Sequence, residues 1–550
     1  MSGPDRSLKA LVIGLDGATF DLLQPMVALG WLPNIERVLG DGAHGILKST
    51  IPPLTAPAWS SFLTGVTPGE HGVFSFQRRL DHSLERAFVD STAIRAPQLW
   101  HWLAQQGLTI GAINVPMTWP PPPMPPGSYL VSGMLTPGTE HHFTNPASLA
   151  EPLRSMGYVC DLRVKLNELD YQSTAGVTSI TRQLLQVLKT REQAIFWLLG
   201  EHPTDLLAAV FETPDRLQHW AWQSIEEQLT NDGGLSRTAL HDGVERCYRE
   251  LDRVVGRLLE EAATPDTRVY FLSDHGFGPL QRRLHVDQWL AEKGWLSYAG
   301  SKAILRRRLR MPIRHLRRML PKNWVRRGRK ALAVSRIVDW QHTVAYSGRT
   351  MEHAIYINLQ GREPYGIVPA SQFDSLRQEI AAALRELRDP TTGAPTVQEV
   401  ALREELYRGP YVDQAPDILF TLAPGYEPTS ELGPRGITSN ALAEGAGIHQ
   451  SGGVFMAVGP GIRTGTEITA HNIEDVLPTI LYGLELPIPT ALQGQVIENV
   501  FEENFLQEHP IRVSNLPLDS ELAREAAFAA RSPEDTEELK RRLEALGYLR

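Results

Sequence analysis

The sequence of 550 residues is poor in cysteine and has no long uncharged apolar run. Its two cysteines, Cys160 and Cys247, are too few for a disulfide scaffold or a thiolate zinc site, and they fit a reducing compartment. No apolar run reaches the roughly 18 residues that a membrane-spanning helix needs. The first residues also lack the apolar core of a signal peptide. We therefore expect a soluble, cytoplasmic protein.

The net charge excludes few classes of protein, and the apolar content indicates a globular protein. The net charge of −9 is modest for this length and gives no global sign of nucleic-acid binding. The apolar share of 42% is that of a globular chain, and the length is sufficient to bury a large core. Apolar strands alternate with helical patterns, which predicts an α/β fold with a doubly wound, mostly parallel sheet. A change of pattern after about residue 290 predicts an inserted, smaller α/β cap or side domain.

The pattern divides the chain into a core in two parts, two inserted segments and a tail. The tail is expected to hold a short helix over 537–546. The expected boundaries are 1–298 and 436–510 for the core, 299–338 for a basic helical insert, 339–435 for the α/β cap region and 511–550 for a C-terminal helical extension.

The apolar run Val269 to Leu272 ends abruptly before Asp274 and His275, and Gly276 follows directly. A short apolar run of this kind indicates a buried strand of a parallel sheet, and ligands bind at the carboxyl ends of such strands. A buried carboxylate is costly unless it is paired, and a metal ion is one possible partner. A capped turn with a hydrogen-bonded aspartate is the alternative for this pair taken alone.

Three further places present an acid or a histidine at a strand end or on the following helix. Asp16 ends the first apolar strand. Asp215 and His219 lie four residues apart on a predicted helix and so share one face, which suits two ligands of one ion or an ordinary helical surface contact. His449 stands in a glycine-rich segment, where a histidine is commonly just a loop residue.

Thr55 precedes a predicted helix that has Pro57 in its first turn, so it is expected to be the N-cap residue. A helix N-terminus presents backbone N–H groups and the positive end of the helix dipole, and both favour a bound phosphate.

Together these motifs resemble the alkaline phosphatase superfamily, and within it the type I phosphodiesterase/nucleotide pyrophosphatase family. The resemblance covers about residues 1–290 and 447–500. The motifs that carry it, in chain order, are Asp16, Thr55 in Pro-Leu-Thr-Ala-Pro-Ala-Trp, Asp215-x-x-x-His219, Asp274-His275-Gly276 and Gly-x-His449.

The resemblance implies a hydrolase that acts on a small-molecule phosphate ester with two divalent metal ions. Carboxylates and imidazoles suit Zn²⁺, with Mn²⁺ as the alternative. Thr55 would attack phosphorus to form a phospho-threonyl intermediate, which water then releases, and a phosphodiesterase is the activity expected first. The implied ligand sets are Asp215, His219 and His449 for one ion, and Asp16, Thr55, Asp274 and His275 for the other.

Other activities of the superfamily stay open, namely a phosphomonoesterase or a phosphosugar mutase. A sulfatase would need a Cys or Ser with Pro and Arg at fixed spacing, and Thr55-Ala-Pro-Ala-Trp59 lacks both the Cys and the Arg. The alternative from outside the enzymes is a protein that binds a membrane surface and has no catalytic activity. It fits poorly, because every implied ligand position holds a chemically competent residue.

One departure from the family concerns the phosphate-binding asparagine that follows the nucleophile in nucleotide pyrophosphatases. Phe76 stands near that position in this chain. Gln77, Arg78 or Asn114 are the residues expected to replace it, so the pyrophosphatase activity is in question while the metal ligands are complete.

The stretch 302–330 carries 13 Lys or Arg residues and no acid. Its apolar residues have nearly helical spacing, and a basic amphipathic helix is typical of contact with an anionic membrane surface. A solvated lid over an acidic catalytic domain is the other interpretation. Trp324 is its one aromatic residue, so stacking on nucleic-acid bases is not expected. The sequence does not indicate the oligomeric state.

Overall fold

The fold is taken from a computed structural model. It describes residues 7–80, 82–162, 174–230, 239–299, 338–349, 351–431, 436–441, 446–515, 536, 537, 539, 540 and 543. The basic stretch 302–330 and most of the expected helix 537–546 lie outside these residues. Within the described part of the chain, no helix is long and apolar enough to cross a membrane.

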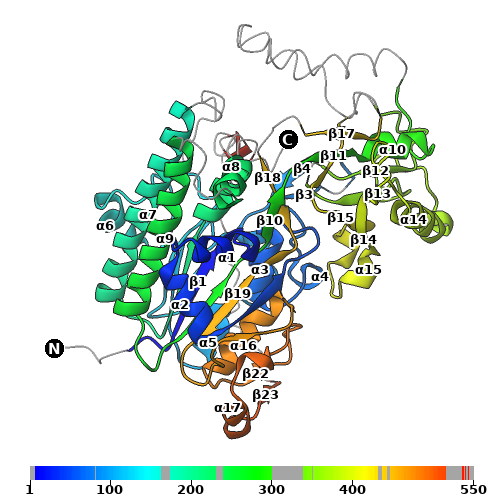
Figure 1. The fold of residues 1–550 in the computed structure, drawn as a ribbon. Helices are drawn as coiled ribbons and strands as arrows, with labels where there is room; N and C mark the ends of the chain where they lie inside the picture. Colours follow the sequence, from blue (N-terminus) through cyan, green and yellow to red (C-terminus); the bar gives the residue numbers. More distant parts are fainter. Residues whose placement is uncertain are drawn as a thin grey trace.

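A large mixed sheet with a parallel centre organises the molecule (Figure 1). Strand β19 (Gly452–Val458) runs antiparallel to both of its neighbours, β9 (Arg268–Leu272) and β2 (Ala43–Lys48). The central strands run parallel to one another, so the expected doubly wound, mostly parallel sheet is confirmed. The parallel centre consists of β9 (Arg268–Leu272), β1 (Ala10–Leu15), β8 (Leu206–Phe211), β5 (Ile110–Ile113) and β6 (Tyr129–Val131), and the flanking strands are β2 (Ala43–Lys48), β7 (Thr144–Asn145), β20 (Thr466–Glu467) and β21 (His471–Asn472).

Helices cover both faces of this sheet, because its central strands are apolar on both sides. In β1 the side chains of Leu11 and Ile13 enter one core, and those of Ala10 and Val12 enter the other. This alternation is the two-residue period of a strand. The first face is covered by α1 (Phe20–Ala28), α2 (Pro33–Asp41), α7 (Thr174–Glu201), α8 (Thr213–Thr230) and α9 (Ala239–Glu261), and the second by α3 (Thr55–Thr64), α5 (Leu99–Gln105) and α16 (Val476–Gly483).

A smaller antiparallel sheet forms a cap beside the main sheet (Figure 1). Helix α14 (Ala370–Arg385) packs on it through Ile380, Ala381 and Leu384, which belong to a separate apolar core. Two short ladders come between the main sheet and the cap in chain order. One pairs β10 (Gly276–Pro279) with β18 (Gly447–Gln450), and the other pairs β11 (Arg282–His285) with two neighbours. The cap strands are β12 (Ala345–Ser347), β13 (Ala354–Ile357), β15 (Ile418–Leu422) and β14 (Val397–Leu402), and β11 pairs with β16 (Tyr426–Thr429) and β17 (Thr438–Asn440).

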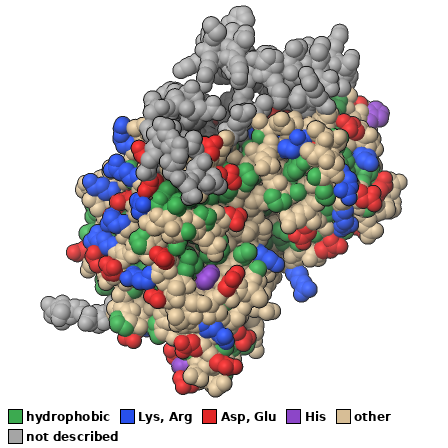
Figure 2. All heavy atoms as spheres, viewed as in Figure 1, with side chains coloured by type: hydrophobic (Ala, Val, Ile, Leu, Met, Phe, Trp, Pro, Cys, Tyr) green, Lys and Arg blue, Asp and Glu red, His purple; other side chains and the backbone are tan. Residues whose placement is uncertain are grey.

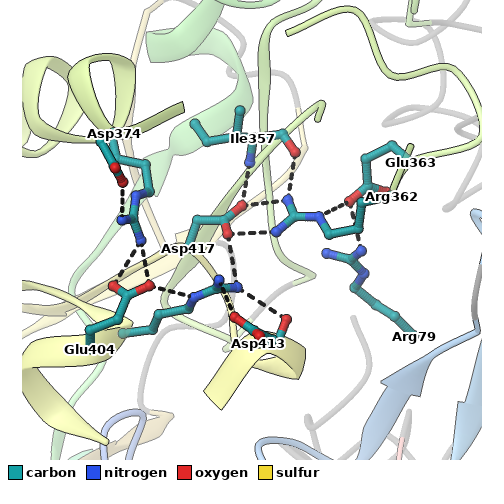
Figure 3. A network of polar contacts seen from close by, with 10 residues as sticks. Arg79, Ile357, Arg362, Glu363, Asp374, Glu404, Asp413 and Asp417 are labelled. Atoms are coloured by element: carbon teal, nitrogen blue, oxygen red, sulfur yellow. Dashed lines mark hydrogen bonds and ion pairs between the residues drawn. The ribbon is translucent and has the colours of Figure 1, made fainter. Parts of the chain in front are cut away.

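A hairpin that follows α3 in the chain joins the core to the cap through ion pairs. It consists of β3 (Gln77–Arg79) and β4 (Arg86–Phe88). Arg79 Nη2 lies 2.6 Å from Glu363 Oε1 of the cap, and Glu363 also contacts Arg362. Arg362 in turn pairs with the buried carboxylate of Asp417 (Figure 3). The hairpin is thus linked by charge to the interior of the cap.

Candidate active site

The first group of potential metal ligands is Asp215, His219 and His449, and all three side chains are buried. Asp215 and His219 lie one turn apart at the start of α8, which follows directly from β8. The Nε2 atoms of His219 and His449 lie 3.3 and 3.4 Å from Asp215 Oδ1. The two Nε2 atoms are 3.0 Å apart. Three ligand atoms therefore converge on one point.

The second group is Asp16, Asp274 and His275, again fully buried. Asp16 follows β1 and Asp274 follows β9, and these strands are adjacent and parallel, so both carboxylates lie at the same edge of the sheet. His275 Nε2 is 3.2 Å from Asp274 Oδ2 and 3.9 Å from Asp16 Oδ1. Gly17, with φ +71°, donates its N–H to Asp274 Oδ1, and a side chain there would press on Asp215.

Hydrogen bonds to the protein orient these ligands. His449 Nδ1 donates to the carbonyl of Pro53 at 2.9 Å, and His275 Nδ1 donates to the carbonyl of Gly276 at 3.2 Å. Each Nε2 is then left as the acceptor nitrogen that faces the carboxylates. Trp59 Nε1 donates to Asp16 Oδ2 at 3.1 Å. The Nδ1–H bonds thus fix the tautomer of both histidines, and the indole N–H fixes the direction of the Asp16 carboxylate. Metal ligands in proteins are oriented by hydrogen bonds of this kind.

Thr55 lies beside the second group. Its side chain is fully buried, and its Oγ1 is 3.3 Å from His275 Nε2. The expectation that Thr55 is the N-cap of α3 is wrong, because Leu54 takes the extended cap conformation and Thr55 is the first helical residue. The hydroxyl is directed at His275 as a result, while the backbone N–H groups of the first turn lie at the same place.

The charges of the site favour a bound cation at each group. Burial, and after it the charge of Asp215, raises the pKa of Asp274 to about 8. Burial also raises the pKa of Asp16, with Asp274 as the next cause. Asp16 Oδ1 and Asp274 Oδ2 accept no hydrogen bond from the described residues. Two buried carboxylates with unused oxygens, next to imidazoles, fit a divalent ion such as Zn²⁺ or Mn²⁺.

The first group differs because a buried arginine stabilises its carboxylate. Burial alone would raise the pKa of Asp215, but His219 and Arg216 hold it well below the usual range. Burial lowers the pKa of His219 to about 4, so this imidazole is neutral at pH 7 and can bind a metal. A neutral histidine and an ionised aspartate are the protonation states that metal ligands need.

Sequence reasoning missed the charges behind the first group. Arg216 contacts Asp215 and places its Nη2 3.0 Å from Asp161 Oδ2. Beside them, Arg191 pairs with Glu212. All of these side chains are nearly inaccessible to solvent. Arg216 is visible next to Asp215 in the sequence, but no local signal connects it to Asp161.

The residues expected to contact phosphate, and Phe76 beside them, have different surroundings in the structure. Phe76 packs into an apolar cluster with Leu54 and Ala56 and offers no polar group. The amide nitrogen of Asn114 donates to Glu212 and, at 3.4 Å, to the carbonyl of Val210, so its donors are already used. Gln77 is buried with its Oε1 unpaired among the described residues, and Arg78, next along β3, is exposed.

A parallel sheet with buried carboxylates and histidines at its carboxyl edge, arranged in two groups, is the design of the alkaline phosphatase superfamily. The chain belongs to the type I phosphodiesterase / nucleotide pyrophosphatase family, whose model matches residues 10–451. The protein is accordingly an enzyme of the phosphoric-ester hydrolase class. The resemblance read from the sequence motifs is confirmed.

Comparison with one solved structure supports the fold. Phosphonoacetate hydrolase from Sinorhizobium meliloti 1021 matches with a TM-score of 0.53 and 16% identity, over 87% of this chain and 95% of that chain. Murine ectonucleotide pyrophosphatase / phosphodiesterase 5 matches with a TM-score of 0.45 and 15% identity, over 90% and 100% of the two chains. No curated protein matches the chain significantly.

Proposed function

We propose that the protein is a two-metal phosphodiesterase that acts on a small-molecule phosphate ester and uses Thr55 as its nucleophile. The observation that carries this proposal is the position of Thr55 Oγ1, 3.3 Å from His275 Nε2 and at the first residue of α3. A phosphate at this point would meet the N–H groups of the first helical turn and the positive end of the helix dipole. The two ligand groups lie directly beside it.

The residues of the site have two proposed roles, as metal ligands and as the nucleophile. Divalent ions supply charge that stabilises the phosphoryl oxygens and lowers the pKa of a nearby hydroxyl. Attack by Thr55 Oγ1 on phosphorus breaks the bond to the ester alcohol and leaves a phospho-threonyl group, which water then hydrolyses. The residues proposed to hold the ions, with Zn²⁺ first and Mn²⁺ second, are Asp215, His219 and His449 in one group and Asp16, Asp274, His275 and Thr55 in the other.

The test is hydrolysis of bis-p-nitrophenyl phosphate by the purified protein with added Zn²⁺ or Mn²⁺, compared between wild type, Thr55→Ala and Thr64→Ala. Thr64 is the matched control, because it lies at the far end of α3 and its hydroxyl donates to the Ser60 carbonyl within the same helix. We expect Thr55→Ala to lose activity by about 10³-fold or more while Thr64→Ala keeps it. Equal rates for Thr55→Ala and wild type would refute the nucleophile.

The same assay separates the related activities. A faster reaction with p-nitrophenyl phosphate would indicate a phosphomonoesterase, and transfer of phosphate to an added sugar would indicate a mutase. The cytoplasmic location and the contact of 302–330 with an anionic membrane surface also stay predictions. Co-sedimentation with phosphatidylserine vesicles, against neutral vesicles as control, tests the second of these.

A further inference from the structure

An apolar cluster adjoins both the proposed nucleophile and a proposed metal ligand. Leu54 and Ala56, which stand on either side of Thr55 in the chain, are buried members of it. Trp220, the residue after His219 in α8, is partly buried against it. The cluster therefore borders the place where the phosphate ester is proposed to bind.

The topology of the main sheet puts further members of the cluster at the same edge. Met117 follows β5, and Met134 and Leu135 follow β6. These strands run parallel to β8 and β1, so they end at the edge where Asp16 lies. Ligands of parallel sheets bind outside this edge, so the cluster is in the right place to meet a substrate.

Three members of the cluster have strained backbone conformations. Met117, Leu135 and, in the cap, Met351 have φ angles of 63°, 78° and 70°, which residues with side chains rarely adopt. Strain of this kind persists only where the surroundings enforce it, and it concentrates at functional sites. Its presence at three places in one cluster favours a functional role over ordinary packing.

The C-terminal segment completes this cluster. Leu539 and Leu543 are members of it and are 3% and 1% exposed. Both are helical, and a spacing of four residues puts them on one helix face. Glu537 is exposed and Lys540 is half-buried, so the apolar pair is the anchored side of the described residues. Figure 1 shows this end of the chain, in red, beside α8.

The chemistry of the cluster suits one kind of ester group. Its members, Phe76 among them, are apolar, and a sugar or a second phosphate placed there would lose its hydrogen bonds to water without replacement. We propose that Leu539 and Leu543 form an apolar wall of the substrate site and select phosphate esters whose organic group is small and apolar. This rests on the proposed function for the position of the phosphate.

Substitutions in the C-terminal segment separate a substrate wall from a packing role. Leu539→Ala, Leu543→Ala and the double variant shorten the wall. Glu537→Ala is the control on the same segment, because that side chain is exposed. Leu103→Ala is the control for lost packing, because Leu103 is fully buried in the separate core on the second face of the sheet.

The measurement is the ratio of kcat/KM values for two diesters that release the same p-nitrophenolate, with Zn²⁺ or Mn²⁺ added. Bis-p-nitrophenyl phosphate keeps a small aryl group, and the p-nitrophenyl ester of thymidine 5′-monophosphate keeps a large polar one. Misfolded protein lowers both rates by the same factor, so the ratio reports the site alone. The Tm of each variant records its loss of stability.

Wild type should prefer the aryl diester. The double variant should shift the ratio toward the nucleotide ester by about tenfold or more, because small changes in an apolar pocket discriminate by this order. Each single variant should lie between the double variant and wild type. Glu537→Ala and Leu103→Ala should keep the wild-type ratio.

A double variant with the wild-type ratio overturns the wall, as does a shift toward the aryl diester or an equal shift in Leu103→Ala. The proposed function is decided separately, by the rates of wild type and Thr55→Ala. An active wild type whose ratio does not respond to the leucines leaves the phosphodiesterase in place and removes only the wall. A wild type that hydrolyses neither diester refutes both.

Discussion

The imidazole rings of His275 and His449 stack with their centroids 3.5 Å apart. His275 precedes β10 and His449 lies in β18, and the two strands pair so that Phe277 faces His449. Each histidine belongs to a different ligand group. The β10–β18 ladder therefore brings the two groups into contact and joins the second part of the core to the first.

The two ligand groups should be separable by substitution. Asp274→Asn removes a charge from the second group and Asp215→Asn removes one from the first, so each variant should lose about one bound ion while keeping the other. Metal content after dialysis, measured by elemental analysis, checks this. Asp413→Asn is the control, because that carboxylate is 92% exposed. Two ions retained in both variants would contradict the assignment.

Trp59→Phe should weaken the second group without removing a ligand. The indole N–H is a hydrogen-bond donor to Asp16 Oδ2, and loss of such an outer partner typically lowers metal affinity by about 10–100-fold. Competition with a chromophoric chelator measures the affinity. The matched control is Trp100→Phe, since Trp100 is equally buried and its Nε1 has no partner among the described residues. Equal affinities in the two variants would count against this role.

Arg216→Met should destabilise the fold strongly. It leaves the buried carboxylate of Asp161 without its partner, and breaking a buried ion pair in this way costs about 3–5 kcal/mol. Urea denaturation of the metal-free protein gives the free energy of unfolding. Arg37→Met is the comparison, because Arg37 and Glu260 form an exposed pair that contributes about 0–1 kcal/mol. A loss no larger than that of Arg37→Met would disprove the buried pair's importance.

The buried histidine His71 should make the protein sensitive to acid. Burial lowers its pKa to about 3 from 6.5, and its Nδ1 accepts the Val73 N–H, which requires a neutral ring. Because the unfolded histidine takes up its proton near pH 6.5 and the folded one only near pH 3, stability is present above pH 6.5 and falls as the pH drops between these values. At pH 5 the loss from this residue is about 2 kcal/mol.

The variant His71→Gln tests this prediction. The change in its unfolding free energy between pH 7 and pH 5 is compared with the same change in wild type. The variant is less stable than wild type at pH 7, because it loses the contact of His71 Nε2 with Ser61 Oγ at 3.0 Å. Its further loss between pH 7 and pH 5 should nevertheless be smaller than that of wild type by about 2 kcal/mol. The unfolding free energies are measured with chelator present, so that metal ligands do not contribute. Equal losses in the two proteins would reject the interpretation.

The parts of the site that could be predicted share a local signal. Asp16 and Asp274 each follow an apolar strand, and Asp215 and His219 are one helical turn apart, so their directions follow from strand ends and helix geometry. The N-cap expectation for Thr55 failed because a side chain's cap position depends on the dihedral angles of Leu54, which the sequence pattern does not fix.

The remaining parts depend on contacts between distant segments. Arg216 pairs with Asp161, although nothing in the sequence around either residue relates the two partners. The substrate candidates Gln77, Arg78 and Asn114 illustrate the same limit. Their residue types suit a phosphate, but only the hydrogen bond of Asn114 to Glu212 shows that one of them is already committed.

The sequence by itself determined the α/β class, the family and the identity of the residues at the strand ends, because hydrophobic periodicity and residue chemistry are local properties. The tertiary structure decided which of these residues meet, because the parallel pairing of β1 with β9 and β8, and the ladder of β10 with β18, bring their ends together. Burial then sets the charge state of each group, and burial is a property of the folded chain alone.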